Sequence, residues 1–230
     1  LRVESPDRQL DAGGLRFVWL TDASPDESVH LLDTLTSAKT EPHLRDSAVF
    51  AISIHRTPSA TATLIALTSP GNDLQLREKA AFWLVNQRGH EGLVAVERLA
   101  RTDADPRFRE KLAFDLNLSK EPEALSELIR MAHEGASPEV RKRAQFWMAA
   151  KGGKLVTANL TEAAEHDPNE QVRRSAVFAL SRLPGSEAAT QLIHVAETSK
   201  DPVVRKQAVF WLGQSSDPSA LDYLTRLLQQ

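Results

Sequence analysis

One pattern of apolar and polar positions occurs six times along the chain, at a constant step of 32 residues. Each copy begins with an arginine that follows an apolar residue. Alanine or leucine stands three residues later, and a large apolar residue stands seven residues later. Positions four residues apart lie on one helical face, so each copy predicts an amphipathic helix rather than a strand. The copies are Arg45–Ile52, Arg77–Leu84, Arg109–Leu116, Arg141–Met148, Arg173–Leu180 and Arg205–Leu212.

Two further signals make each copy the second helix of a helical hairpin. A capping side chain followed by proline predicts where a second helix begins. These pairs are Glu41-Pro42, Asp105-Pro106, Ser137-Pro138, Asp167-Pro168 and Asp201-Pro202. Between successive copies, a further apolar position also recurs every 32 residues and predicts a first helix. It is occupied by Leu32, Leu64, Val96, Leu128, Leu160, Leu192 and Leu224.

The predicted architecture is all-α, with six hairpins and a last single helix over 217–230. The hairpins are expected at 25–56, 57–88, 89–120, 121–152, 153–184 and 185–216. Because one hairpin cannot bury both of its faces, stacking on its neighbours must supply the core. We therefore predict a single solenoid domain over 25–230, with residues 1–24 as an N-terminal cap segment.

The repeat resembles the HEAT repeat, in particular the short bacterial form also found in phycobilin lyases. The shared elements are a first helix, an Asp-Pro turn, and Val-Arg-Arg-x-Ala at the start of the second helix. Asp167–Leu180 (DPNEQVRRSAVFAL) matches best, and the resemblance covers about residues 25–230. It implies a right-handed α–α superhelix whose second helices line the concave side. It also implies a bacterial protein whose repeat arginines bond the turn of their own or a neighbouring repeat. The compartment, cytoplasm or periplasm, stays open.

Phenylalanine stands five residues after every repeat arginine, where the bacterial repeat usually has a solvent-facing glutamate. The six are Phe50, Phe82, Phe114, Phe146, Phe178 and Phe210. At about 100° per residue, these rings point roughly 200° from the centre of the apolar face, so we expect a ladder along the concave side. The ladder is either an apolar groove for a partner or a spine of rings packed on one another, and the two interpretations are compatible.

Tryptophan alternates with smaller residues at the position after these phenylalanines. Trp19, Trp83, Trp147 and Trp211 recur every 64 residues, and the intervening copies carry Ala51, Asp115 and Ala179. The alternation indicates packing of large against small side chains in neighbouring repeats. Asp115 places a carboxylate between copies with tryptophan. It is either partly buried or, as we expect, solvated near the groove wall.

The residue after each repeat arginine is charged and adjacent to the phenylalanine on the helical wheel. These residues are Asp46, Glu78, Glu110, Lys142, Arg174 and Lys206. They predict a groove that is acidic in its first half and basic in its second, which would orient a partner of opposite polarity.

Composition excludes several classes of protein. The formal net charge is −3, so we expect no general attraction to nucleic acid. Charges recur every few residues, which predicts a soluble protein without membrane insertion. With no cysteine there is no thiolate metal site. Exposed leucines are expected in the last helix, which predicts a monomer or weak self-association.

Catalytic chemistry finds little support in the residues. The seven histidines show no metal-ligand spacing. The HEAT-like iron enzyme deoxyhypusine hydroxylase has His-Glu pairs within its second helices, whereas His90-Glu91 and His133-Glu134 fall near a turn and a first-helix end. We predict a scaffold without catalytic residues, metal or cofactor that binds a protein or extended peptide. The alternative is a HEAT-like enzyme of the phycobilin lyase or DNA glycosylase type.

Overall fold

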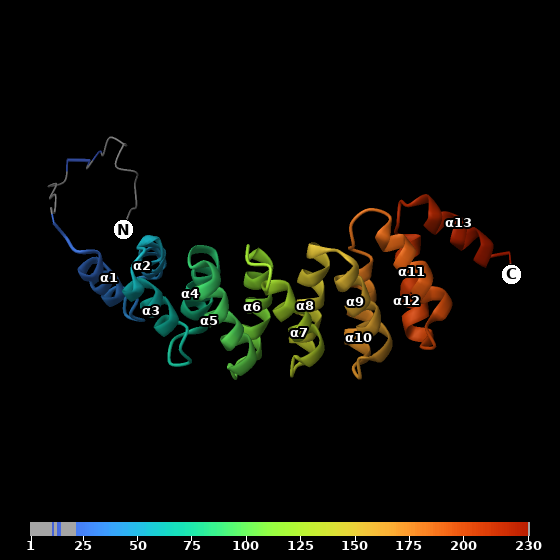
Figure 1. The fold of residues 1–230 in the computed structure, drawn as a ribbon, viewed down its shortest axis with the longest axis horizontal. Coiled ribbons are helices and arrows are strands. Elements are labelled where there is room, and N and C mark those ends of the chain that lie inside the picture. Colours follow the sequence, from blue (N-terminus) through green and yellow to red (C-terminus); the bar gives the residue numbers. More distant parts are fainter. Residues whose placement is uncertain (1–10, 12, 15–21, 230) are drawn as a thin grey trace. The chain divides into compact units, whose positions relative to one another are not determined.

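The computed structural model describes residues 11, 13–14 and 22–229, and within them every regular element is a helix (Figure 1). The helices are α1 (Pro25–Thr34), α2 (Pro42–Ile54), α3 (Pro58–Leu67), α4 (Leu74–Gln87), α5 (Gly89–Thr102), α6 (Pro106–Leu118), α7 (Ala124–Glu134), α8 (Pro138–Lys151), α9 (Lys154–His166), α10 (Glu170–Leu180), α11 (Glu187–Thr198), α12 (Pro202–Gly213) and α13 (Pro218–Leu227). Two helices fall inside each predicted hairpin, and α13 follows them. The predicted all-α class is confirmed.

The chain forms two compact units, unit 1 (residues 1–96) and unit 2 (residues 97–230), and the boundary falls within α5. In unit 1, α1 packs on α2 and α3, and α4 packs on α2 and α3. Most of the predicted N-terminal cap over 1–24, including Trp19, lies outside the described residues. That residues 25–230 form one continuous domain stays a prediction.

In unit 2 the helices follow one another in chain order (Figure 1). They pack in two layers. The second helices α6, α8, α10 and α12 each pack on the next. The first helices α7, α9, α11 and α13 do the same, and each hairpin joins the two layers. We call these the second-helix layer and the first-helix layer.

The buried core consists of the apolar positions that define the repeat. In α4, α6, α8, α10 and α12, the residues before, three after and seven after the arginine are all buried. Phe108, Leu112 and Leu116 in α6, for example, have no exposed surface. Burying one such side chain contributes about 1.5–3 kcal/mol, which accounts for the fixed register of the repeat.

Most second helices begin where the capping signals predict, with one exception. Ser137 and Asp201 accept backbone N–H bonds at the starts of α8 and α12. In α10 the expected start at Asp167-Pro168 is wrong, because Asn169 is the N-cap and the helix begins at Glu170. The proline lies two residues further from the arginine here than in the other copies. Asn169 therefore occupies the N-cap position, which lies four residues before the repeat arginine in the other copies as well.

The repeat arginines bond the turns, as the resemblance implies. Nη1 of Arg141 donates to the carbonyl of Gly135 in its own turn at 2.8 Å, and Nε donates to Asp167 of the next turn at 2.8 Å. Arg173 repeats both bonds, to the carbonyl of Asp167 at 2.8 Å and to Asp201 at 2.9 Å. In unit 1, Nη1 of Arg45 donates to Asp73 of the following turn at 2.7 Å. These arginines fasten successive repeats together.

The last helix leaves apolar side chains in contact with solvent. Leu221, Leu227 and Leu228 are exposed, whereas Ala220 and Tyr223 are buried on the side of α13 that faces the stack. Weak self-association through this face stays a prediction. Among the described residues, no helix combines the length and the apolar character that crossing a bilayer requires.

Candidate binding surface

Phenylalanines of the predicted ladder lie at the surface of the second helices and are neither fully buried nor fully exposed. The first five, Phe50 to Phe178, are half-buried. Phe210 on α12 is 52% exposed. Each ring therefore keeps a solvent-facing part.

In unit 2 these rings contact one another through the tryptophans and form a continuous row across four helices. Trp147 lies between Phe114 and Phe146, with both centroid distances at 4.9 Å. Phe146 and Phe178 are nearly parallel, at 15° and 6.2 Å. Trp211 then lies 5.0 Å from Phe178 and 5.0 Å from Phe210. We call this row the aromatic strip, and it consists of Phe114, Trp147, Phe146, Phe178, Trp211 and Phe210.

Unit 1 shows the same arrangement on a smaller scale. The ring of Trp83 lies 5.0 Å from Phe50 of the preceding repeat and 4.9 Å from Phe82 beside it. Each described tryptophan thus packs against the phenylalanine of the preceding repeat. The rings form a spine, and their exposed parts remain available to a partner, so the structure accommodates both interpretations of the ladder.

The intervening position after the phenylalanine is buried in all three copies that lack tryptophan. Ala51 and Ala179 are buried, as a small residue there requires. Asp115 is also fully buried, so the expectation of a solvated aspartate is wrong. Nζ of Lys111, one helical turn earlier, lies 2.6 Å from Oδ1 of Asp115 and 4.4 Å from the centroid of the Phe114 ring. The lysine covers the carboxylate and supplies its counter-charge.

The charged residues after the arginines are placed beside the phenylalanines, and several have ionic neighbours. Asp46 pairs with Lys79 at 2.7 Å, and Glu110 lies 4.0 Å from Arg143. Cations of the following repeat therefore offset part of the acidity predicted for the first half, where Glu78 is half-buried. In the second half, Lys142 is half-buried, and Arg174 and Lys206 are exposed.

Two cavities lie along the aromatic strip, each between two successive second helices. One, of about 410 Å³, is bounded by α10 and α12 and lined by Phe210 together with Arg174 and Lys206. The other, of about 360 Å³, is bounded by α6 and α8. It is lined by Phe114, Trp147, Glu110, Arg107, Lys111 and Arg143. Each cavity thus combines an aromatic wall with two or more cations.

Three of these cations were missed by the sequence interpretation, which considered only the position after the arginine. Arg107 lies two residues before Arg109, and Lys111 and Arg143 lie two residues after a repeat arginine. At about 100° per residue, both positions fall within about 60° of the phenylalanine on the helical wheel. The wheel could have identified them.

A cavity in unit 1, of about 620 Å³, is lined by Arg88, a half-buried cation with a structural role. Arg88 donates to the carbonyls of Ser53 and His55 at 2.8 and 2.7 Å and so caps the C-terminal end of α2. Burial lowers the pKa of Arg88, and the nearby charge of Glu91 opposes this shift. The arginine stabilises helix carbonyls there.

The two His-Glu pairs lie at helix ends. His90 is the second residue of α5, and His133-Glu134 closes α7. The ring of His133 contacts Oδ1 of Asn159 at 2.7 Å and Oε2 of Glu162 at 3.1 Å, so it bridges α7 and α9.

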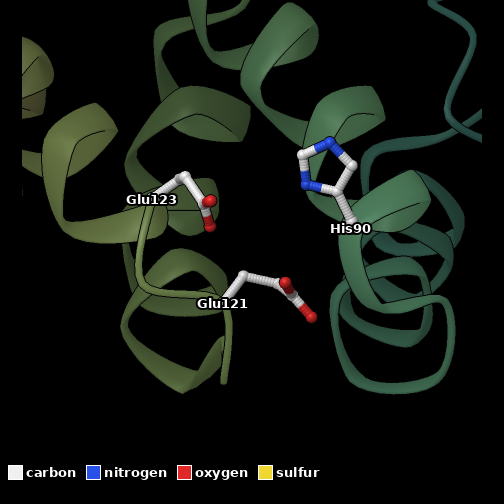
Figure 2. A group of neighbouring side chains, drawn as sticks. All are labelled: His90, Glu121 and Glu123. Carbon is white, nitrogen blue, oxygen red and sulfur yellow. The ribbon is translucent and has the colours of Figure 1, made fainter.

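Figure 2 draws His90 together with two acidic side chains, Glu121 and Glu123, all of them at least partly exposed. His90 belongs to unit 1, whereas Glu121 and Glu123 belong to the connection between α6 and α7 in unit 2. The three therefore do not constitute a metal site within either unit.

Stacked helical hairpins of constant length define this chain as an α-helical repeat protein. Residues 157–230 match the family model for HEAT repeats, so the resemblance of the repeat is confirmed over this part of the chain.

Two solved structures of this kind resemble the chain. Human deoxyhypusine hydroxylase in complex with glycerol is 18% identical over 88% of this chain and 90% of that chain, with a TM-score of 0.45. The complex of CpcE and CpcF of phycocyanin lyase from Nostoc sp. PCC7120 is 19% identical over 90% of this chain and 81% of that chain, with a TM-score of 0.42. No curated protein matches the sequence.

Proposed function

We propose that this protein is a non-catalytic scaffold that binds a partner protein or extended peptide on the second-helix layer of unit 2. The observation that carries the proposal is the aromatic strip, in which six rings form a row across four helices and each keeps an exposed part. Exposed aromatic rows on a rigid repeat are typical of surfaces that bind another chain, because rings bury a large area at little cost in conformational entropy.

The rigidity of the strip supports the same proposal. Phe146 contacts Trp147 and Phe178, so its ring is already ordered before a partner arrives. A partner therefore gains contact area without having to order these side chains. The usual bacterial glutamate at this position would offer neither the area nor the order.

Absence of a catalytic centre is part of the proposal. An enzyme needs several titratable groups gathered in one pocket, with pKa values displaced toward their task. Among the described residues, the groups with displaced pKa values do not gather in one pocket. Backbone N–H bonds lower the pKa of Glu41 and Asp201 at helix N-termini, and bonds to Glu127 raise the pKa of Arg101 and Arg130. Caps and ion pairs account for all of these shifts.

Selection from a displayed library of random peptides tests the proposal directly. Peptides are enriched on the full chain and then on a Phe178→Ala variant, with Leu155→Ala as the matched control. Leu155 is 58% exposed on α9, in the first-helix layer. We expect enrichment that survives Leu155→Ala and is lost with Phe178→Ala. Enrichment that is equal on both variants, or none at all, contradicts the proposal.

A further inference from the structure

The two helix layers of unit 2 carry opposite charge. The second helices α6, α8, α10 and α12 hold eleven arginines and lysines against four acidic residues, and α12 has no acidic residue. The first helices α7, α9, α11 and α13 hold seven acidic residues against three basic ones. A chain whose net charge is −3 thus presents its aromatic strip on a basic layer.

The structural arginines account for only part of this positive charge. Arg141, Arg173 and Arg205 donate to backbone carbonyls of their own turns. Six further cations beside the strip are at least partly exposed, and four of them already lie near a carboxylate of the chain. The six are Arg107, Lys111, Lys142, Arg143, Arg174 and Lys206.

Cations lie beside aromatic rings at both ends of the strip. Arg174 and Lys206 share a cavity with Phe210. Arg107 and Arg143 share a cavity with Phe114 and Trp147, which the acidic Glu110 also lines. An occupant of either cavity meets a ring on one wall and positive charge on another. Such cations bind carboxylates and phosphates in proteins through charge-assisted hydrogen bonds.

We infer that the partner is a short acidic segment of a protein, with apolar side chains that lie on the aromatic strip and carboxylates that enter the two flanking cavities. The inference rests on the proposed function. Packed helices are spaced about 8–10 Å apart, and an extended chain advances about 3.3 Å per residue. The three steps from α6 to α12 therefore accommodate about nine residues.

Single-stranded nucleic acid is the competing ligand, because it also combines negative charge with rings that stack on aromatic side chains. The geometry of the strip favours the peptide. Stacking of bases needs free ring faces, whereas Phe146 and Phe178 face one another at 15°. Phe210 and Trp211 meet edge to face at 79°. Because these contacts already occupy part of the ring faces, less free face is left on which bases could stack.

Three synthetic peptides of about nine residues test the inference. They share phenylalanines at three alternate central positions and differ only in the other residues, which are all glutamate, all glutamine or all lysine. Fluorescence anisotropy measures their affinity for the full chain, and an oligothymidylate of similar length is the fourth probe. We expect the glutamate peptide to bind most tightly and to weaken as salt is raised. Lys206→Glu should weaken it about tenfold, and Lys154→Glu on α9 should leave it unchanged.

Each other outcome overturns the inference in a recognisable way. If the glutamine or lysine peptide binds as tightly as the glutamate peptide and loses affinity in Phe178→Ala, the strip binds peptides without preferring acids, and the proposed function stands. If the oligothymidylate binds most tightly through the strip, both proposals are wrong. If no probe binds, the acidic segment is refuted, and the library selection decides the proposed function separately.

Discussion

An ion pair between Arg141 and Asp167 joins two successive repeats, and its removal tests how the stack is stabilised. Nε of Arg141 lies 2.8 Å from Oδ2 of Asp167, and Nη2 lies 3.0 Å from Oδ1. The two side chains are only 11% and 6% exposed. Arg141→Met keeps most of the aliphatic stem but leaves a nearly buried carboxylate without its counter-charge, which is the costly case for an ion pair.

We expect Arg141→Met to lower the free energy of unfolding by about 3 kcal/mol, the lower end of the range for breaking a buried pair. The lower end applies because Oδ1 of Asp167 still accepts the amide of Asn169 at 2.8 Å. The next repeats supply internal comparisons. Arg173 and Asp201 are 21% and 22% exposed, so Arg173→Met should cost about 1.5–2 kcal/mol. Arg174 and Glu170 are 44% and 47% exposed, so Arg174→Met should cost about 0.5 kcal/mol or less.

Urea denaturation followed by far-ultraviolet circular dichroism measures all three variants. Adding Asp167→Asn to Arg141→Met removes the unpaired charge and should recover part of the lost stability. Equal losses in the three variants, or a loss below about 1 kcal/mol for Arg141→Met, would refute the reasoning that burial sets the cost.

Four further predictions use the same assay. Phe146→Ala should cost about 1–3 kcal/mol, since its ring is half-buried between Trp147 and Phe178; a loss below about 0.5 kcal/mol would mean the ring packs on nothing. Gln145→Leu should stabilise the protein by about 1 kcal/mol or more, because the side-chain amide is fully buried and has no hydrogen-bond partner in the described part of the chain. Every other repeat has an apolar residue at this position. Destabilisation by Gln145→Leu would contradict this reasoning. Lys111→Met should cost about 3 kcal/mol or more, since it removes the ammonium group from the fully buried carboxylate of Asp115, and an unchanged urea midpoint would refute that role. The backbone N–H of Val203, and then the guanidinium of Arg173, hold the pKa of Asp201 below its ordinary value near 3.8. The contribution of Asp201 to stability is therefore complete above that pH and is lost as the pH falls through the lower folded-state pKa. Asp201→Asn should reduce this loss of stability at acid pH, and an unchanged loss would contradict the assignment.

The helices and their register could be predicted because burial repeats at a constant step. The core positions around each arginine select a helix of one register, and they are buried in α4, α6, α8, α10 and α12. The start of α10 could not be read from Asp167-Pro168, because the capping register belongs to the position four residues before the arginine, where Asn169 stands. The spacing from the repeat arginine therefore indicates the start of α10 better than the Asp-Pro pair does.

The candidate site was predicted in its residues but not in its contacts. Spacing placed the phenylalanines on one face of the second helices, but tryptophan bridges between neighbouring repeats depend on ring orientation. The burial of Asp115 was also missed, since it depends on where the flexible side chain of Lys111 lies. The positive charge of the whole layer became visible only once the second helices of unit 2 were known to pack on one another.

Photocrosslinking tests the central claim, that the aromatic strip of unit 2 is the surface that binds a partner. p-Benzoylphenylalanine replaces Phe210 in one variant and Leu155 in another, since both side chains are exposed but lie on opposite layers. Each variant is irradiated with a peptide enriched on the wild-type chain. We predict a covalent adduct at position 210 and none at position 155. An adduct at 155 without one at 210 would contradict the account.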